Sequence, residues 1–251
     1  MYNIYLDAAI LVLIFQHIVM LIAFLKKDNG IVDVFWGLGF TTVAIFVHIV
    51  YPHPYSWLTM LLVAIWGFRL AIHIGVRNAR KKTEDWRYAN WRKDWGKWFY
   101  IRSYLQVFLL QGFFMWVILL PVLQRPGTDN LQWYQYLGIA LWLFGLLWES
   151  IGDWQLFQFK KNPNNKGKIL TTGLWALSRH PNYFGEAVLW WGIALFVLPW
   201  GLWYLSLLGA LTITWLLTRV SGVPFLEWKY RDNPEYLEYI RRTPAFVPRF
   251  F

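Results

Sequence analysis

The residues of this chain that are best suited to chemistry lie together at positions 178–186, in the sequence Ser-Arg-His-Pro-Asn-Tyr-Phe-Gly-Glu. Pro181 suits the first turn of a helix, where its missing N–H group costs nothing. The free backbone N–H groups and the positive dipole end of such a helix attract anions. Arg179 and His180, directly before it, would add positive charge. The pattern predicts a site for cofactor phosphates, although a simple anchor in lipid headgroups would use the same two residues.

Asn182 and Glu186 lie four residues apart in the same predicted helix and therefore share one face. Both enter an apolar segment, where a polar or charged side chain is costly and usually marks a functional site with a partner. We expect them deeper in the site than the phosphates, an arrangement that suits a nucleotide cofactor. Hydrogen bonds to neighbouring helices are the simpler alternative.

A second group of polar residues follows the apolar segment at 133–149. Glu149 and Asp153 are four residues apart, and Lys160 lies two turns further along the same face. The two carboxylates could hold ribose hydroxyls or an amide of a cofactor. An ion pair with Arg179 or Arg219 is about as plausible for either one alone.

Basic residues cluster at the end of the third apolar segment. Arg69, His73, Arg77 and Arg80 are spaced by four, four and three residues, which places them on one helix face. Ten basic residues between 69 and 102 exceed what membrane orientation requires, so anionic lipid or cofactor phosphates are natural partners.

The part of the chain after the last apolar segment supplies further candidates. Arg219 ends that segment, and Glu227 follows eight residues later. Asn233 and Pro234 have the types expected for the cap and the first residue of a helix.

Composition places the chain in a membrane. It is 57% hydrophobic, 21% aromatic and only 15% charged, against about 25% charged in soluble proteins. The absence of cysteine excludes disulfides and thiolate chemistry. We predict an all-α, polytopic membrane protein with seven transmembrane helices, at approximately 7–25, 33–50, 57–73, 104–123, 133–149, 187–199 and 201–218.

The distribution of Lys and Arg predicts the orientation. Of the 24 basic residues, all but Arg125 fall in loops on one side of the predicted membrane. The positive-inside rule then predicts the N-terminus outside and the C-terminus in the cytoplasm, and it explains most of the net charge of +10 without nucleic acid. We expect one multi-pass membrane domain that comprises residues 1–251.

Positions 173–186, with Trp190-Trp191-Gly192, resemble the C-terminal signature of the steroid 5-alpha-reductase superfamily, and more closely a bacterial branch of unknown function. The resemblance covers most of the chain and is strongest over 149–251; sterol reductases of the C14 and C24 type have a similar ending. It implies NADPH-dependent reduction of a conjugated carbon–carbon double bond in a steroid-like, isoprenoid or other lipid substrate. It also implies a bacterial inner membrane as the location, with a substrate side at 1–103 and a cofactor side at 104–251. Glu149 stands where steroid reductases carry asparagine, and Glu227 where they carry a tyrosine. Together with the residues argued above, the expected NADPH-binding residues are Arg77, Asn78, Arg80, Glu149, Asp153, Lys160, Arg179, His180, Asn182, Tyr183, Arg219, Glu227 and Tyr236.

The substrate side departs from this family. Steroid reductases place a glutamate on the second helix and a tyrosine on the third to polarise the substrate ketone. Here Trp66 stands at the tyrosine position and the second helix has no glutamate. Asp33 and Tyr88 are possible replacements, one of which would supply the proton. The expected catalytic residues are therefore Tyr88, Asp33 and Glu186.

Two other interpretations stay open. Isoprenylcysteine carboxyl methyltransferases, which use S-adenosylmethionine, carry a similar Arg-His-Pro-x-Tyr element, here at 179–183, and downstream Glu, Tyr and Arg residues, here Glu227, Tyr236, Tyr239 and Arg241. A non-enzymatic lipid-binding protein would use the basic residues for headgroups only. The five scattered histidines lack metal-site spacing, so we expect no metal. The expected partners are the lipid bilayer and a hydrophobic small molecule, with the oligomeric state left open.

Overall fold

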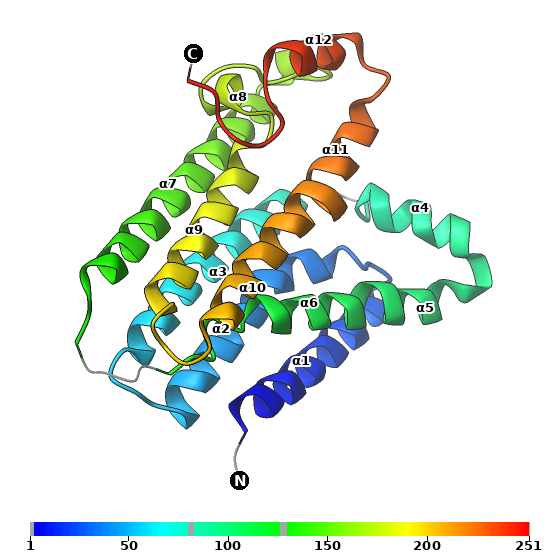
Figure 1. Ribbon diagram of the computed structural model, residues 1–251. Coiled ribbons are helices and arrows are strands. Elements are labelled where there is room, and N and C mark those ends of the chain that lie inside the picture. The colour runs from blue at the N-terminus through cyan, green and yellow to red at the C-terminus, as the bar shows by residue number, and fades with distance from the viewer. Residues whose placement is uncertain (1–2, 80–82, 126–129, 251) are drawn as a thin grey trace. The chain divides into compact units, whose positions relative to one another are not determined.

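The computed structural model describes residues 3–79, 83–125 and 130–250. This part of the chain is helical and contains no strand, which confirms the predicted all-α class for the described residues (Figure 1). The chain forms two compact units. Unit 1 comprises Met1–Asp129 and Pro199–Leu205, and unit 2 comprises Asn130–Leu198 and Ser206–Phe251. This division by contacts differs from the functional halves at 1–103 and 104–251, whose assignment stays a prediction.

Unit 1 contains three long helices and one segmented helix. The long helices are α1 (Ile4–Lys26), α2 (Ile31–Val50) and α3 (Ser56–Ala79). The segmented stretch runs through α4 (Trp86–Trp95), η1 (Gly96–Trp98), α5 (Phe99–Arg102), the π-helical η2 (Ser103–Leu109) and α6 (Leu110–Ile118). π-Helical turns are rare and recur at functional sites.

Two glycines allow α2 and α3 to touch through their backbones. A Cβ atom at Gly37 would lie 2.3 Å from the carbonyl oxygen of Gly67, and one at Gly67 would lie 2.4 Å from that of Gly37. Small residues permit such close helix packing in membranes. This contact fixes the position of α2, which carries Asp33 in its first turn.

The loop between α9 and α10 packs within unit 1. Trp200 is buried, stacks on Tyr55 at a centroid distance of 5.9 Å, and meets the ring edge of His53 at 5.4 Å. The backbone N–H of Leu202 donates to Gln124 Oε1 at 3.0 Å. This short loop is therefore an integral part of unit 1.

Unit 2 is built around α7 (Trp133–Lys161) and α9 (Pro181–Val197), which run side by side (Figure 1). Its other elements are η3 (Pro163–Asn165), α8 (Leu174–Leu177), most of α10 (Trp203–Trp215), the π-helical η4 (Leu216–Val220), α11 (Val223–Tyr230) and α12 (Pro234–Arg242). The two predicted helix starts are confirmed. Pro181 is the first residue of α9, and Asn233 caps α12 by accepting a hydrogen bond from the Tyr236 N–H at 3.1 Å.

Glycines spaced by seven residues bring α7 and α9 into backbone contact. A Cβ atom at Gly145 would lie 2.5 Å from the backbone nitrogen of Leu189, and one at Gly185 would lie 2.5 Å from that of Glu149. Gly192 repeats the pattern one heptad later, against Trp142 at 2.5 Å. We call this contact the glycine seam. It fixes the register that sets the polar ends of the two helices against each other.

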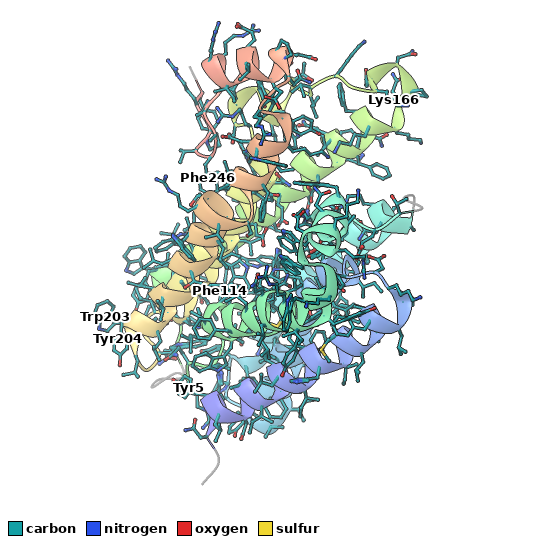
Figure 2. All side chains as sticks on the ribbon, turned by 90° about the vertical axis from the view of Figure 1, so that its right-hand side faces the viewer. Tyr5, Phe114, Lys166, Trp203, Tyr204 and Phe246 are labelled. Atoms are coloured by element: carbon teal, nitrogen blue, oxygen red, sulfur yellow. The ribbon has the colours of Figure 1, made fainter. Side chains whose placement is uncertain are left out.

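Five stretches of the described chain are helices long and apolar enough to cross a membrane. They are Ile4–Lys26, Ile31–Val50, Ser56–Ala79, Trp86–Ile118 and Trp203–Tyr230. The other two predicted spans, 133–149 and 187–199, fall in α7 and α9; α9 has 17 residues, fewer than the ~20 that a bilayer requires. A multi-pass membrane protein is thus supported, while seven spans and their orientation stay predictions. The exposed rings of Trp203 and Tyr204 point away from α10 (Figure 2), as at membrane interfaces.

Candidate active site

Two of the expected catalytic residues meet in unit 1, although 55 residues separate them in the sequence. The first turn of α2 carries Asp33, and the first turn of α4 carries Tyr88. The Tyr88 hydroxyl donates a hydrogen bond to Asp33 Oδ1 at 2.9 Å. Arg87 forms an ion pair with the other oxygen, Asp33 Oδ2. The carboxylate of α2 therefore holds both the phenol and a guanidinium.

Arg87 was not among the residues predicted from the sequence. Its Nε atom donates to Asp85 Oδ1 at 2.9 Å, and its backbone N–H donates to the same oxygen at 3.2 Å. Asp85 is the N-cap of α4, so it fixes both the start of the helix and the guanidinium. In the sequence, the opposite charges of Asp85 and Arg87 on either side of Trp86 could have indicated an ion pair. They could not have indicated that Arg87 also pairs with Asp33.

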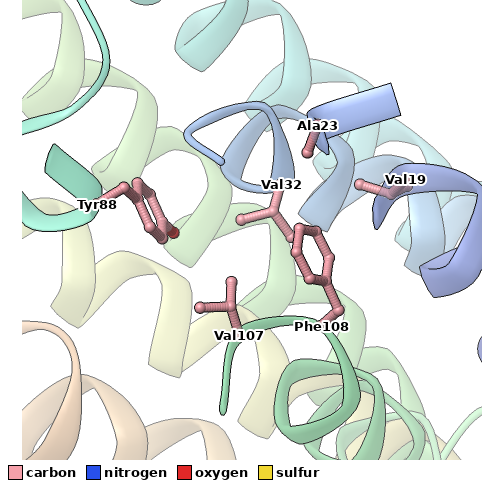
Figure 3. Close-up of a cluster of buried hydrophobic side chains, with 6 residues drawn as sticks. All are labelled: Val19, Ala23, Val32, Tyr88, Val107 and Phe108. Carbon is pink, nitrogen blue, oxygen red and sulfur yellow. The ribbon is translucent and has the colours of Figure 1, made fainter. Parts of the chain in front are cut away.

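The ring of Tyr88 lies in an apolar environment. It belongs to a cluster with Val19, Ala23, Val32, Val107 and Phe108 (Figure 3). Only 2% of Tyr88 is exposed. The ring is thus packed into the core of unit 1, while its hydroxyl meets the carboxylate of Asp33.

A polar cavity of about 310 Å³ in unit 1 shares Asp85 with this network. Asn78, one of the predicted cofactor residues, lines it and accepts a hydrogen bond from Arg77 Nε at 3.3 Å. Arg80 lies outside the described residues. The cavity is lined by Lys26, Lys27, Asp28, Gly30, Asn78, Thr83, Glu84 and Asp85.

Trp66, which stands where steroid reductases have a tyrosine, is fully buried in unit 1 and meets Phe40 edge-on at 5.3 Å. It fills the α2–α3 core, and the phenol of Tyr88 comes from α4 instead.

Arg179 is an internal connector of unit 2. Its Nε donates to Glu227 Oε1 at 3.0 Å, and Nη2 forms an ion pair with the same atom. Its Nη1 donates to the carbonyl oxygens of Thr243 at 2.5 Å and Ile240 at 3.4 Å. The guanidinium is buried, so it links the start of α9 to α11 and to the end of α12.

His180 is the buried side chain at the start of α9. It is 3% exposed, stacks on Tyr183 at 5.5 Å, and has no hydrogen-bond partner at either ring nitrogen among the described residues. Its Nε2 lies 3.7 Å from Glu227 Oε1, too far for a hydrogen bond. Burial lowers the pKa of His180, although the Glu227 carboxylate opposes this effect. The imidazole is therefore neutral at neutral pH.

Asn182 and Asp153 meet across the α7–α9 contact. Asn182 Nδ2 donates to Asp153 Oδ1 at 3.1 Å, while Asn182 Oδ1 is buried without a hydrogen-bond partner in the described chain. Glu149 on α7 and Glu186 on α9 are also buried. The structure thus gathers the predicted acidic and amide residues at one end of the helix pair.

The remaining predicted residues are more dispersed. Tyr236 is buried, and its burial raises the pKa of the phenol to about 12, so it serves as a neutral hydrogen-bonding group. Lys160 and Arg219 are exposed on unit 2, with Arg219 inside the π-helical η4. In the described ranges, no three His, Asp or Glu side chains gather in a group that could hold a metal.

In the part of the chain that the structure describes, the fold is helical and supports a multi-pass membrane protein. A part-buried polar network surrounds Asp33 in unit 1, and buried polar residues gather at the α7–α9 contact in unit 2. The chain belongs to the family described as "Protein of unknown function (DUF1295)", whose model matches residues 19–243. Over 118 residues it is 42% identical to a protein of Ustilaginoidea virens named "Probable O-methyltransferase ustE". That match covers 46% of this chain and only 36% of the relative's length. No solved structure matches the chain.

Proposed function

We propose that the protein is a membrane-embedded, NADPH-dependent reductase of a conjugated carbon–carbon double bond in a hydrophobic substrate. The observation that carries this proposal is the 2.9 Å hydrogen bond from the Tyr88 hydroxyl to Asp33. The resemblance to steroid reductases implies a tyrosine supported by a carboxylate of the second helix. Here Asp33 would take the place of the glutamate, and Tyr88 would replace the tyrosine of the third helix.

The residues around Tyr88 suit an acid that works on a polarised carbonyl. A reduced nicotinamide supplies a hydride when it is bound. Tyr88 would donate its hydrogen bond to the substrate carbonyl and then its proton as negative charge develops there. Arg87, whose guanidinium carbon lies 5.1 Å from the centre of the Tyr88 ring, would stabilise the phenolate that remains. In the resting protein Asp33 accepts the one hydrogen bond that the Tyr88 hydroxyl can donate, so the substrate carbonyl would have to replace Asp33 as its acceptor. Water would supply the proton that restores the phenol after the reaction.

Unit 2 offers groups that suit a nucleotide. Asn182 Oδ1, which has no partner within 3–79, 83–125 and 130–250, can accept N–H donors, and the neutral ring of His180 offers one donor and one acceptor. Asp153, already bound to Asn182, has further acceptor capacity for ribose hydroxyls. These three side chains are our proposed cofactor contacts.

A methyltransferase is the second candidate, favoured by the name of the relative from Ustilaginoidea virens. The carboxylates Glu149, Asp153 and Glu186 would then face the positively charged sulfonium and ammonium groups of S-adenosylmethionine. Methyl transfer to an oxygen nucleophile requires no proton donor for a carbonyl, so the Tyr88–Asp33 pair would have no catalytic part in it.

Ligand binding by the intact protein in detergent tests the proposal. NADPH, NADH and S-adenosylmethionine are titrated separately while thermal unfolding is followed. A ligand present at about 100 times its Kd stabilises the folded state by about 2.7 kcal/mol. We expect NADPH to raise the melting temperature of the wild type and of Glu238→Gln, a control on the exposed face of α12, but not of Asn182→Ala.

The outcomes separate the candidates. Stabilisation by S-adenosylmethionine with no effect of NADPH would overturn the reductase and favour the methyltransferase. Stabilisation by none of the three ligands would overturn both and leave a lipid-binding protein.

A further inference from the structure

The segment Pro244–Phe250, which follows α12, lies along the residues that precede α9. The Arg179 N–H donates to the carbonyl oxygen of Pro244 at 2.9 Å, and the Arg249 N–H donates to that of Leu177 at 2.9 Å. The two stretches are therefore antiparallel, because the earlier residue of one, Leu177, pairs with the later residue of the other, Arg249. In Figure 1, α8 and α12 lie at the same end of unit 2 as the end of the chain.

Ser178 connects this segment to His180. The hydroxyl of Ser178 is fully buried and donates to the carbonyl oxygen of Phe246 at 2.8 Å. The Ser178 hydroxyl oxygen itself accepts a hydrogen bond from the His180 N–H at 3.2 Å. The Ser178 hydroxyl thus bonds the backbone of the segment at Phe246 and the backbone of His180. Its removal would leave the buried His180 N–H without this partner.

Aromatic side chains reinforce the contact. Phe246 packs against Phe184 of α9 at a centroid distance of 5.9 Å, and Phe250 packs against Trp148 of α7 at 6.2 Å. Phe184 and Trp148 are themselves 5.9 Å apart. The segment is thereby attached to both helices of the glycine seam.

We propose that Pro244–Phe250 is a clasp that holds the start of α9 in its binding conformation, with Ser178 and Arg179 as positioning residues rather than ligand contacts. The inference rests on the proposed function only in taking His180 and Asn182 as cofactor contacts. The donors of Arg179 are already engaged with Glu227 and with the backbone at 240 and 243. His180 and Asn182 keep buried polar atoms that find no hydrogen-bond partner among the residues the structure describes, and the clasp determines where those atoms lie.

Hydrogen exchange and nucleotide binding test the clasp. Three variants are compared with the wild type: a chain that ends after Thr243, Ser178→Ala, and the control Glu238→Gln. We expect amide exchange over 178–185 to accelerate about tenfold in Ser178→Ala and further in the shortened chain, because local opening becomes easier. The Kd for the nucleotide that the wild type binds, NADPH or S-adenosylmethionine, should rise about tenfold in Ser178→Ala. Glu238→Gln should match the wild type in both measurements.

The two failures are distinguishable. Unchanged exchange over 178–185 in the shortened chain overturns the clasp, whatever the ligand result. Faster exchange with an unchanged Kd in Ser178→Ala also overturns it, because the clasp would then not position the site. A wild type that binds neither nucleotide overturns the proposed function, and the exchange measurement still decides whether the segment holds the start of α9.

Discussion

At the scale of single residues, the surroundings of a side chain decide its role. Arg179 and His180 are neighbours in the sequence, and both were predicted to bind phosphate. In the structure the guanidinium of Arg179 is engaged within unit 2, whereas the buried ring of His180 has no hydrogen bond to any described residue. The sequence could not distinguish them, because the partners of Arg179 come from positions 227, 240 and 243.

Tyr88→Phe tests the proposed acid. The ring and its apolar contacts are kept, so loss of one hydrogen bond to a carboxylate should lower the free energy of unfolding by about 1.5–3 kcal/mol. NADPH oxidation with an α,β-unsaturated ketone as probe substrate should fall at least about 100-fold, as expected for loss of general acid catalysis. The control is Tyr100→Phe, because Tyr100 is exposed on α5. Equal turnover by wild type and Tyr88→Phe would contradict the assignment.

The buried neutral His180 predicts a dependence of stability on pH. Its pKa is lowered in the folded state from the ordinary value of 6.5. Below that value the unfolded chain binds more protons at this residue, so stability must decrease as pH falls through 6.5 and below. Between about pH 7.5 and about pH 5, the melting temperature of the wild type should fall more than that of His180→Gln.

The comparison of the two proteins isolates His180. Burial also lowers the pKa of His53, to about 4, and acts in the same direction, but it is present in both proteins. If the melting temperatures of the wild type and of His180→Gln fell equally as the pH was lowered, a buried neutral His180 would be contradicted.

At the scale of elements, the sequence predicted what local chemistry determines. The start of α9 at Pro181 and the cap of α12 at Asn233 both follow from the residues at those positions. The pairing of Asp33 with Tyr88 could not be predicted, because it depends on how α2 and α4 pack. The same holds for the π-helical turns η2 and η4, which no local pattern revealed.

The close packing in the glycine seam predicts that one added methyl group at Gly185 lowers the stability of the fold. In Gly185→Ala the new Cβ would lie 2.5 Å from the Glu149 backbone nitrogen, so α7 and α9 must separate. Overpacking of this kind costs about 1–3 kcal/mol. The matched control is Gly75→Ala on α3, where the nearest atom would be Val34 Cγ1 at 3.9 Å and where alanine favours the helix. Thermal unfolding in detergent should show a lower melting temperature for Gly185→Ala only.

At the scale of the whole molecule, the number of membrane spans decides which loops share a side. With seven spans, residue 130 lies outside and residue 166 lies in the cytoplasm. With the five spans that the described helices support by length and composition, both lie on the same side. α7 has 29 residues, which at 1.5 Å per residue is long enough to cross a bilayer.

The chain has no cysteine, so a single cysteine introduced by substitution can be labelled to show on which side of the membrane it lies. Asn130→Cys and Lys166→Cys place thiols at exposed positions, the second labelled in Figure 2. In intact cells, a membrane-impermeant maleimide should label Asn130→Cys and leave Lys166→Cys unlabelled until the cells are opened. Labelling of both in intact cells would contradict seven spans.

The loop Pro199–Leu205 has a consequence for how relatives can be recombined. It interrupts the sequence of unit 2 but belongs to unit 1, where Trp200 is buried against Tyr55 and His53. A chimaera made at a single junction near residue 129 would therefore pack this loop against unit 1 of a different protein. Exchange of unit 2 as a cassette requires that residues 199–205 stay with their own unit 1.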